Sequence, residues 1–183
     1  KGNIAYLLFS LCVLIAALTY GFYRLYPKPA TRNPQPIKVS LIQGNIPQEL
    51  KWQAYSQEFI LDRYIKLSRE AAVDKPDLII WPEAAVTGFF QNPRDAWIFE
   101  RIFSLGNELK TPILFGSVIE EGSNYFNSAL LMNVTGQVMQ RYDKLHLVPF
   151  GEYIPLKKLF PFLETVVPIG DFVPGVDYTD FLF

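Results

Sequence analysis

The sequence LIIWPEA at residues 78–84 is the clearest indication of the fold of this chain. Its four apolar residues, 78–81, predict a short buried strand. Pro82 lacks a backbone N–H and cannot continue a central strand, so the strand ends there. Glu83 therefore follows the carboxyl end of a strand, which is where open α/β sheets bind their ligands.

Outward from this strand, strand-like segments alternate with segments of helical periodicity. Apolar runs predict further strands at 37–44, 113–119, 125–132 and 137–142. Helical spacing predicts helices at 55–72 and 96–109. The order favours an α/β fold with a mainly parallel, helix-covered sheet, and the last two strands are expected to form a hairpin through Asn133-Val134-Thr135-Gly136.

The helix predicted at 55–72 has one face suited to a core. The apolar residues that recur on this face are Tyr55, Phe59, Ile60 or Leu61, Tyr64, Ile65, Leu67, Ala71 and Ala72. We expect them to pack against the sheet.

The N-terminal segment 4–23 runs for about 20 residues without a charge. As a helix it would extend ~30 Å, the thickness of a bilayer's hydrocarbon core, and tyrosines and cations gather near one end, as at a membrane interface. The alternatives are a buried core helix or a signal peptide, whose apolar region is usually shorter. We therefore predict a transmembrane helix in residues 1–26, a stiff proline-rich linker at 27–36 and a soluble domain at 37–183. Because the chain begins with Lys1, we expect it to be cut from a longer polypeptide.

Composition limits the classes of function. Seventeen basic and eighteen acidic residues give a net charge of -1, which leaves no electrostatic footprint for nucleic acid. Cys12 and His146 are the single cysteine and the single histidine, so the sequence contains no intramolecular disulfide and no Cys-rich or His-built metal site. We expect no metal and no cofactor.

Two charged residues are candidates for chemistry. The apolar neighbours of Glu83 predict a partly desolvated carboxylate, a setting that suits a general base. Lys144 follows a predicted strand and can supply the fixed positive charge that stabilises an oxyanion. Taken singly, each has an ordinary alternative: Glu83 as an exposed turn residue, and Lys144 as a surface lysine paired with Asp143.

Together, WPEA at 81–84 and YDKLHLVPFGEYIP at 142–155 resemble the nitrilase, or carbon-nitrogen hydrolase, superfamily. The resemblance implies an incomplete α-β-β-α sandwich and a Glu-Lys-Cys triad. Glu83 would be the base and Lys144 the stabiliser of the tetrahedral intermediate.

Further motifs narrow the resemblance. VSLIQGNIPQ at 39–48, KW at 51–52 and HLVPFGEYIP at 146–155, all after an apolar span, are similar to the apolipoprotein N-acyltransferase family. That family implies acyl transfer from a membrane phospholipid, through a cysteine thioester, to the N-terminal amine of a lipoprotein. By the same resemblance, Glu152 supports the triad and Trp52 lies near the substrate, although Trp52 also suits a plain core position.

The resemblance also implies a location in the bacterial inner membrane, with the domain on the periplasmic side. The cations that follow the apolar segment, Arg24, Lys28 and Arg32, instead favour a cytoplasmic domain. The sequence alone is compatible with a domain on either side of the membrane.

The triad cysteine is the missing component. Cys12 lies in the middle of the apolar segment, where a thiolate is disfavoured, and is interpreted as a small apolar residue. His146 is interpreted as a loop hydrogen-bonding residue. We expect the nucleophile to lie beyond Phe183, so that this piece alone is inactive. Two alternatives are a membrane-tethered amidase or nitrilase that uses water, and a non-catalytic binding module.

Overall fold

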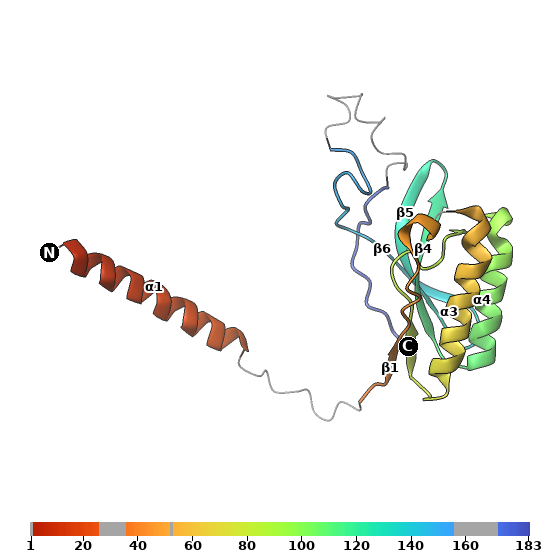
Figure 1. The fold of residues 1–183 in the computed structure, drawn as a ribbon, viewed down its shortest axis with the longest axis horizontal. Coiled ribbons are helices and arrows are strands. Elements are labelled where there is room, and N and C mark those ends of the chain that lie inside the picture. Colours follow the sequence, from red (N-terminus) through yellow and green to blue (C-terminus); the bar gives the residue numbers. More distant parts are fainter. Residues whose placement is uncertain (1, 26–35, 52, 156–171) are drawn as a thin grey trace. The chain divides into compact units, whose positions relative to one another are not determined.

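The computed structural model describes residues 2–25, 36–51, 53–155 and 172–183 (Figure 1). The chain divides into two compact units, Lys1–Pro36 and Ile37–Phe183. The first contains one helix, α1 (Gly2–Leu25), and the predicted linker lies outside the described residues except for Pro36.

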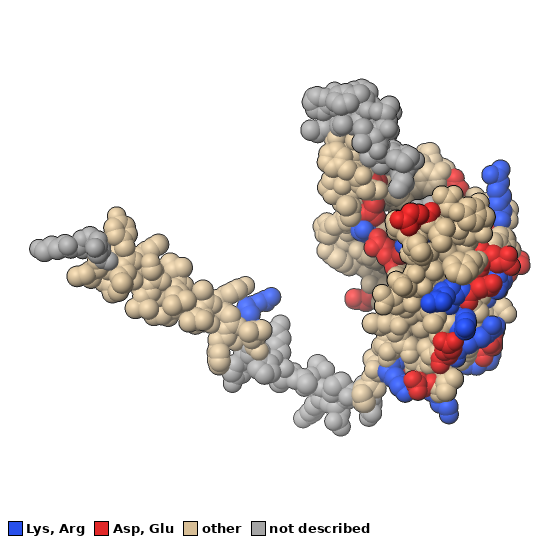
Figure 2. Space-filling view, viewed as in Figure 1, with Lys and Arg blue, Asp and Glu red and all other residues tan. Residues whose placement is uncertain are grey.

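Helix α1 has the length and composition of a membrane span. Its segment Ile4–Leu25 has a mean hydropathy of 2.1 and none of it is buried inside the structure. Arg24 is the single charged residue in the helix. Figure 2 shows the contrast between this nearly uncharged surface and the second unit, which carries charges of both signs.

The second unit is built on one mixed sheet. Its strands are β1 (Val39–Leu41), β2 (Leu78–Ile80), β3 (Phe89–Phe90), β4 (Ile113–Glu121), β5 (Asn124–Met132) and β6 (Val138–Asp143). They follow the order β1-β2-β4-β5-β6, with β3 also paired to β4. The pairs among β1, β2, β3 and β4 are parallel, and β5 is antiparallel to both β4 and β6.

The hairpin predicted for 125–142 is confirmed, and the sheet is mixed: of the five strand pairs described, three are parallel and two are antiparallel. Strand β5 turns back directly from β4 with Glu121 paired to Asn124, which leaves two residues in the turn. Gly122 has φ of +62°, a conformation that glycine adopts at little cost. A tight turn needs no crossover helix, so β4, β5 and β6 form an antiparallel meander.

Two helices lie side by side on one face of the sheet, α3 (Gln57–Ala72) and α4 (Ala96–Leu109) (Figure 1). The shorter elements are α2 (Gln48–Lys51), η1 (Ala54–Ser56) and η2 (Pro93–Asp95). The described residues of the second unit thus form one helix layer and one sheet layer, which is one half of an α-β-β-α sandwich.

The core lies between this helix layer and the sheet. The buried residues of α3 are Ile60, Leu61, Tyr64, Ile65 and Ser68. They form one stripe, and Tyr55 and Phe59 fall outside it at 77% and 57% exposure, so the prediction that these two face the core is wrong. From the sheet, Ile113, Phe115, Leu130 and Met132 are fully buried in the same core.

Side chains alternate between the two faces of a strand, so the neighbours of these core residues lie on the face that α3 and α4 leave uncovered. Gly116 pairs with Ala129 across β4 and β5, and Ala129 pairs with Tyr142 of β6. No helix of the described residues covers this face, called here the helix-free face, and it carries the candidate site.

Candidate active site

Glu83 is held over the sheet by backbone hydrogen bonds on both sides of its turn. The N–H of Trp81 donates to the carbonyl of Leu114 at 2.8 Å, and the N–H of Val86 donates to the carbonyl of Gly116 at 3.0 Å. Between these bonds, Ala84 has φ of +48°, which is unusual for a residue with a side chain. The turn is therefore hydrogen-bonded to β4, which is the longest of the strands that pair in parallel.

Gly116 makes this close approach possible. A Cβ atom at position 116 would lie 2.5 Å from Ala84 N and 2.8 Å from Glu83 Cα. Ordinary contacts begin near 3.4 Å. A side chain here would push the Glu83 turn away from the sheet.

Lys144 and Asn127 are neighbours across β5 and β6. Asp143 pairs with Ser128, and one step further the N–H of Lys144 donates to the carbonyl of Asn127 at 2.9 Å. Directly opposed residues on antiparallel strands project from the same face. Both side chains therefore lie on the helix-free face, near Glu83.

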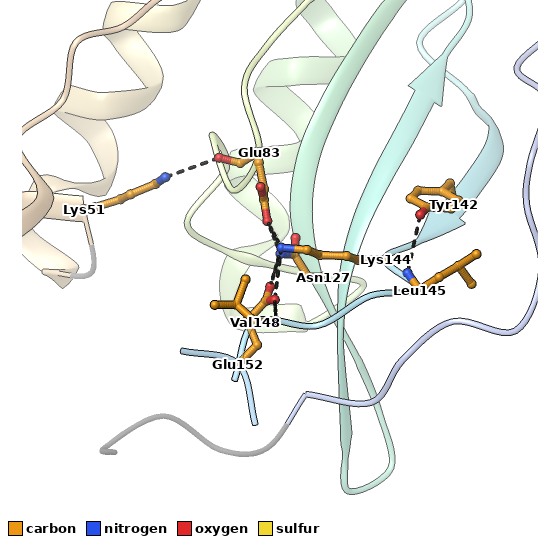
Figure 3. A network of polar contacts seen from close by, with 8 residues as sticks. All are labelled: Lys51, Glu83, Asn127, Tyr142, Lys144, Leu145, Val148 and Glu152. Atoms are coloured by element: carbon orange, nitrogen blue, oxygen red, sulfur yellow. Dashed lines mark hydrogen bonds and ion pairs between the residues drawn. The ribbon is translucent and has the colours of Figure 1, made fainter. Parts of the chain in front are cut away.

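Glu152 comes from the loop that follows β6. Its backbone N–H donates to the carbonyl of Val148 at 2.9 Å, and its Oε2 accepts from the N–H of Val148 at 2.8 Å. The carbonyl of Glu152 accepts from the N–H of Phe172 at 2.8 Å. These bonds fix the loop so that the carboxylate points to Lys144 (Figure 3).

The four side chains meet at one point (Figure 3). Lys144 Nζ lies 2.9 Å from Glu83 Oε1 and 3.1 and 3.0 Å from Glu152 Oε1 and Oε2. Asn127 Nδ2 donates to Glu83 Oε1 at 2.5 Å and to Glu152 Oε1 at 2.6 Å. One ammonium and one amide thus bridge two carboxylates.

The environment keeps Lys144 and Glu152 charged. Burial alone would lower the pKa of Lys144, but hydrogen bonds and charge from Glu83 and Glu152 outweigh it and raise that pKa above its ordinary value. Burial alone would raise the pKa of Glu152. Hydrogen bonds from Val148, Asn127 and Lys144 instead hold the Glu152 pKa below its ordinary value. At neutral pH the pair is a stable ammonium and carboxylate.

The two carboxylates differ in what surrounds them. The side chain of Glu152 is 12% exposed and that of Glu83 is 61% exposed. Among the described residues, the hydrogen bonds to the Glu83 carboxylate all end on Oε1, so Oε2 faces no described donor. Glu83 is thus the carboxylate with an open oxygen, held by its cationic and amide partners rather than buried by its apolar neighbours.

The alternative interpretation of Lys144 was a surface lysine paired with Asp143. Asp143 accepts from Arg141 Nε at 2.7 Å and from Ser128 Oγ at 2.5 Å, while Lys144 turns to Glu83 and Glu152. The surface pair of Lys144 with Asp143 is therefore not the arrangement formed.

A cavity of about 280 Å³ opens beside this cluster. Its polar lining includes Glu83, Asn127, Tyr142 and Lys144, and its floor is the sheet from Leu114 to Gly116. Among the described residues, no group of His, Cys, Asp and Glu side chains is placed to hold a metal ion. The cavity thus combines an apolar floor with a fixed cation and a few polar groups, as small-molecule sites do.

The other candidate residues lie in different settings. Trp52 falls outside the described residues. His146 is exposed in the loop after β6, and Cys12 is exposed in α1. The interpretation of Cys12 as a residue of the apolar helix agrees with this position.

Two polar contacts of the site, made by Lys51 and Asn127, were not predicted from the sequence. Lys51 Nζ donates to the backbone carbonyl of Glu83 at 3.3 Å, and burial lowers the pKa of Lys51, with the charge of Glu83 acting in the opposite direction. Asn127 was part of a predicted strand without a role. The available signal was a lone amide among the half-buried and buried residues of YFNSALLM at 125–132.

Comparison with known proteins places the chain in a family. The carbon-nitrogen hydrolase family model matches residues 38–171. A protein named apolipoprotein N-acyltransferase from Geobacter metallireducens is 45% identical over 172 residues, covering 90% of this chain and 32% of that protein. One of the same name from Methylococcus capsulatus is 33% identical over 144 residues, covering 76% of this chain and 27% of that protein. The chain thus spans about one third of the length of the curated relatives it matches.

Solved structures agree in fold. A carbon-nitrogen hydrolase from Helicobacter pylori superposes with a TM-score of 0.53 at 16% identity, covering 76% of this chain and 45% of that one. The resemblance read from the two motif segments and the nitrilase-like fold are both confirmed. The chain belongs to the carbon-nitrogen hydrolase family.

Proposed function

We propose that the full-length protein is a membrane-bound N-acyltransferase that moves a fatty acyl chain from a phospholipid to the N-terminal amine of a diacylglyceryl-cysteine lipoprotein. The observation that carries the proposal is the Lys144 ammonium bridging Glu83 and Glu152 beside an open cavity. The names of the two relatives support the choice of reaction. We further propose the bacterial inner membrane as its location, with the catalytic unit on the periplasmic side.

In the first half-reaction, Glu83 Oε2 accepts the proton of a cysteine thiol. A thiol with an ordinary pKa near 8.5 is a poor nucleophile until a base and a nearby cation favour the thiolate. The thiolate attacks the ester carbonyl of the phospholipid, and Lys144 stabilises the oxyanion. The C–O bond breaks, the lysophospholipid alkoxide takes the proton from Glu83, and a thioester remains on the enzyme.

In the second half-reaction, the lipoprotein amine attacks the thioester carbonyl. Glu83 takes a proton from the amine, the C–S bond breaks, and the thiolate recovers a proton from Glu83. The products are an amide and the free thiol. Glu152 stays ionised throughout, because its pKa is held low, and keeps Lys144 directed at the reacting carbonyl.

The apolar helix α1 supports the choice of a lipid donor. Burial of an acyl chain in a bilayer contributes ~0.8 kcal/mol per CH₂, so extraction of a long chain is costly. An active site that works at the membrane surface avoids this cost. Trp52, which follows Lys51 in sequence, is proposed to contact the lipid or lipopeptide.

The reaction needs a thiol that Cys12 does not supply, since Cys12 belongs to the apolar helix. We propose that another cysteine of the full-length protein, at a strand end beside Glu83 and Lys144, supplies the thiol, and the full-length sequence tests this directly. A cysteine at a strand end supports the enzyme, whereas serine, alanine or glycine there favours the non-catalytic binding module.

The test of the roles is acyl-enzyme formation, measured as the mass increase of full-length protein mixed with phospholipid. We expect Glu83→Ala and Lys144→Ala to abolish the thioester. A normal acyl-enzyme in either variant would contradict the assignments. To separate transfer from hydrolysis, free fatty acid is measured with and without a diacyl lipopeptide. Equal release under both conditions would identify a tethered amidase-like hydrolase instead.

A further inference from the structure

The geometry points to Asn127 as a positioning residue that holds both carboxylates of the site against the single ammonium of Lys144. The inference rests on the proposed function for its kinetic test, but not for its spectroscopic one. It assigns a role to a residue of β5 that does not belong to the Glu-Lys-Cys set.

The donor count fits this role. A side-chain amide carries two N–H bonds on one nitrogen. Asn127 Nδ2 directs one to Glu83 Oε1 at 2.5 Å and the other to Glu152 Oε1 at 2.6 Å. The opposite orientation would place the amide oxygen against two carboxylate oxygens, so the contacts themselves determine which way the amide points.

Charge explains why a neutral donor belongs here. Glu83 and Glu152 share one ammonium, so the cluster carries a net charge of -1 and the carboxylates repel each other. Lys51 reaches the backbone carbonyl of Glu83 and is a second cation near this end of the cluster. An amide adds two hydrogen bonds to the ionised forms without adding a charge.

The strand gives Asn127 a fixed place relative to Lys144. Its backbone carbonyl accepts the N–H of Lys144, and its side chain shares both carboxylate partners with the Lys144 ammonium. The backbone of Asn127 thus holds Lys144, and its side chain holds the two carboxylates that Lys144 contacts. Asn127 is also one cause of the lowered pKa of Glu152.

Loss of the amide donors should make the Glu152 carboxylate easier to protonate, because hydrogen bonds to the charged form favour that form. In full-length Asn127→Ala, we expect the rate of acyl-enzyme formation to fall roughly 10²-fold, the loss that a misplacement of about 1 Å causes. We expect the acid limb of the pH–rate profile to move to higher pH. Asn127→Asp keeps the shape but adds a third carboxylate, so its acid limb should move further, by about one pH unit or more.

The control is Asn124→Asp, at the exposed start of the same strand, which should leave the rate and profile unchanged. The independent readout is the titration of the Glu152 carboxyl by NMR of protein labelled with ¹³C at the glutamate carboxyl, assigned with Glu152→Gln. We expect its pKa to rise in both Asn127 variants. A wild-type carboxyl titration in folded Asn127→Ala and Asn127→Asp overturns the inference, even if no acyl-enzyme forms in any variant. Absence of acyl-enzyme from the wild-type protein would overturn the proposed function alone.

Discussion

Replacement of Gly116 by alanine tests whether close packing of the Glu83 turn on β4 positions the base. The new Cβ would meet Ala84 N at 2.5 Å, and Glu83 Cα and Pro82 O at 2.8 Å each. These are backbone atoms, which no rotamer change can move. Because ordinary contact begins near 3.4 Å, the turn must retreat by most of an ångström.

Two effects follow from that retreat. Overpacking of this kind costs about 1–3 kcal/mol, and each kcal/mol lowers the Tm of a unit this size by roughly 2–4 °C. The Lys144 Nζ to Glu83 Oε1 contact of 2.9 Å would lengthen, and a displacement of about 1 Å costs ~10²-fold in rate. We therefore expect a lower Tm and a larger loss of acyl-enzyme formation than the stability change explains.

The assay is thermal unfolding of the detergent-solubilised full-length protein together with the rate of thioester formation well below the Tm. Gly21→Ala makes the same chemical change where no atom of the described residues lies within 4 Å, and it should leave both quantities nearly unchanged. A Gly116→Ala protein with wild-type Tm and wild-type rate would refute the reasoning.

Three further changes have expected outcomes. Ser68→Ala removes the hydroxyl that accepts from Trp81 Nε1 at 2.8 Å inside the core, so denaturant unfolding should show a loss of about 1–3 kcal/mol, and an unchanged midpoint would contradict the bond. Glu152→Gln removes one of the charges that raise the Lys144 pKa, so the alkaline limb of the pH–rate profile should move to lower pH. The Glu152 pKa is lowered in the folded state, so its contribution to stability is present above its unfolded pKa and is lost as pH falls through the folded pKa; the same variant should show a weaker acid dependence of unfolding, and an unchanged dependence would count against the assignment. Cys12→Ser should form acyl-enzyme at the wild-type rate, and loss of the thioester would show that Cys12 is the nucleophile.

The sequence was sufficient for most elements of the fold. Apolar periodicity located α3, α4 and β4 within a few residues, and Pro82 marked the end of β2. It did not predict that β4 turns straight into β5, because the signal lies in Gly122 and Ser123 alone, and one glycine between polar residues is compatible with many loops.

The site was predictable in part. Motifs identified Glu83, Lys144 and Glu152, but nothing local indicates that Asn127 lies opposite Lys144. The pairing depends on an irregularity near Leu131 and Met132, since Met132 pairs with Val138 while Leu131 pairs with Gln140. Without this extra residue, the register would shift by one and Asn127 would face Asp143 instead. A β-bulge leaves little trace in a single sequence, so the bonds from Asn127 to Glu83 and Glu152 are evident only in the structure.

The mixed sheet also implies an order in which the site is assembled during folding. Lys144 and Asn127 reach their places through the hairpins of the β4-β5-β6 meander, which join neighbouring segments. Glu83 arrives through the parallel pairing of β2 with β4, and it lies 61 positions from Lys144. Contacts between distant segments form more slowly, because a longer loop must close first. We therefore expect the Lys144 ammonium and the Asn127 amide to come together early and Glu83 to join them late, so partial unfolding would detach Glu83 before it separates Asn127 from Lys144.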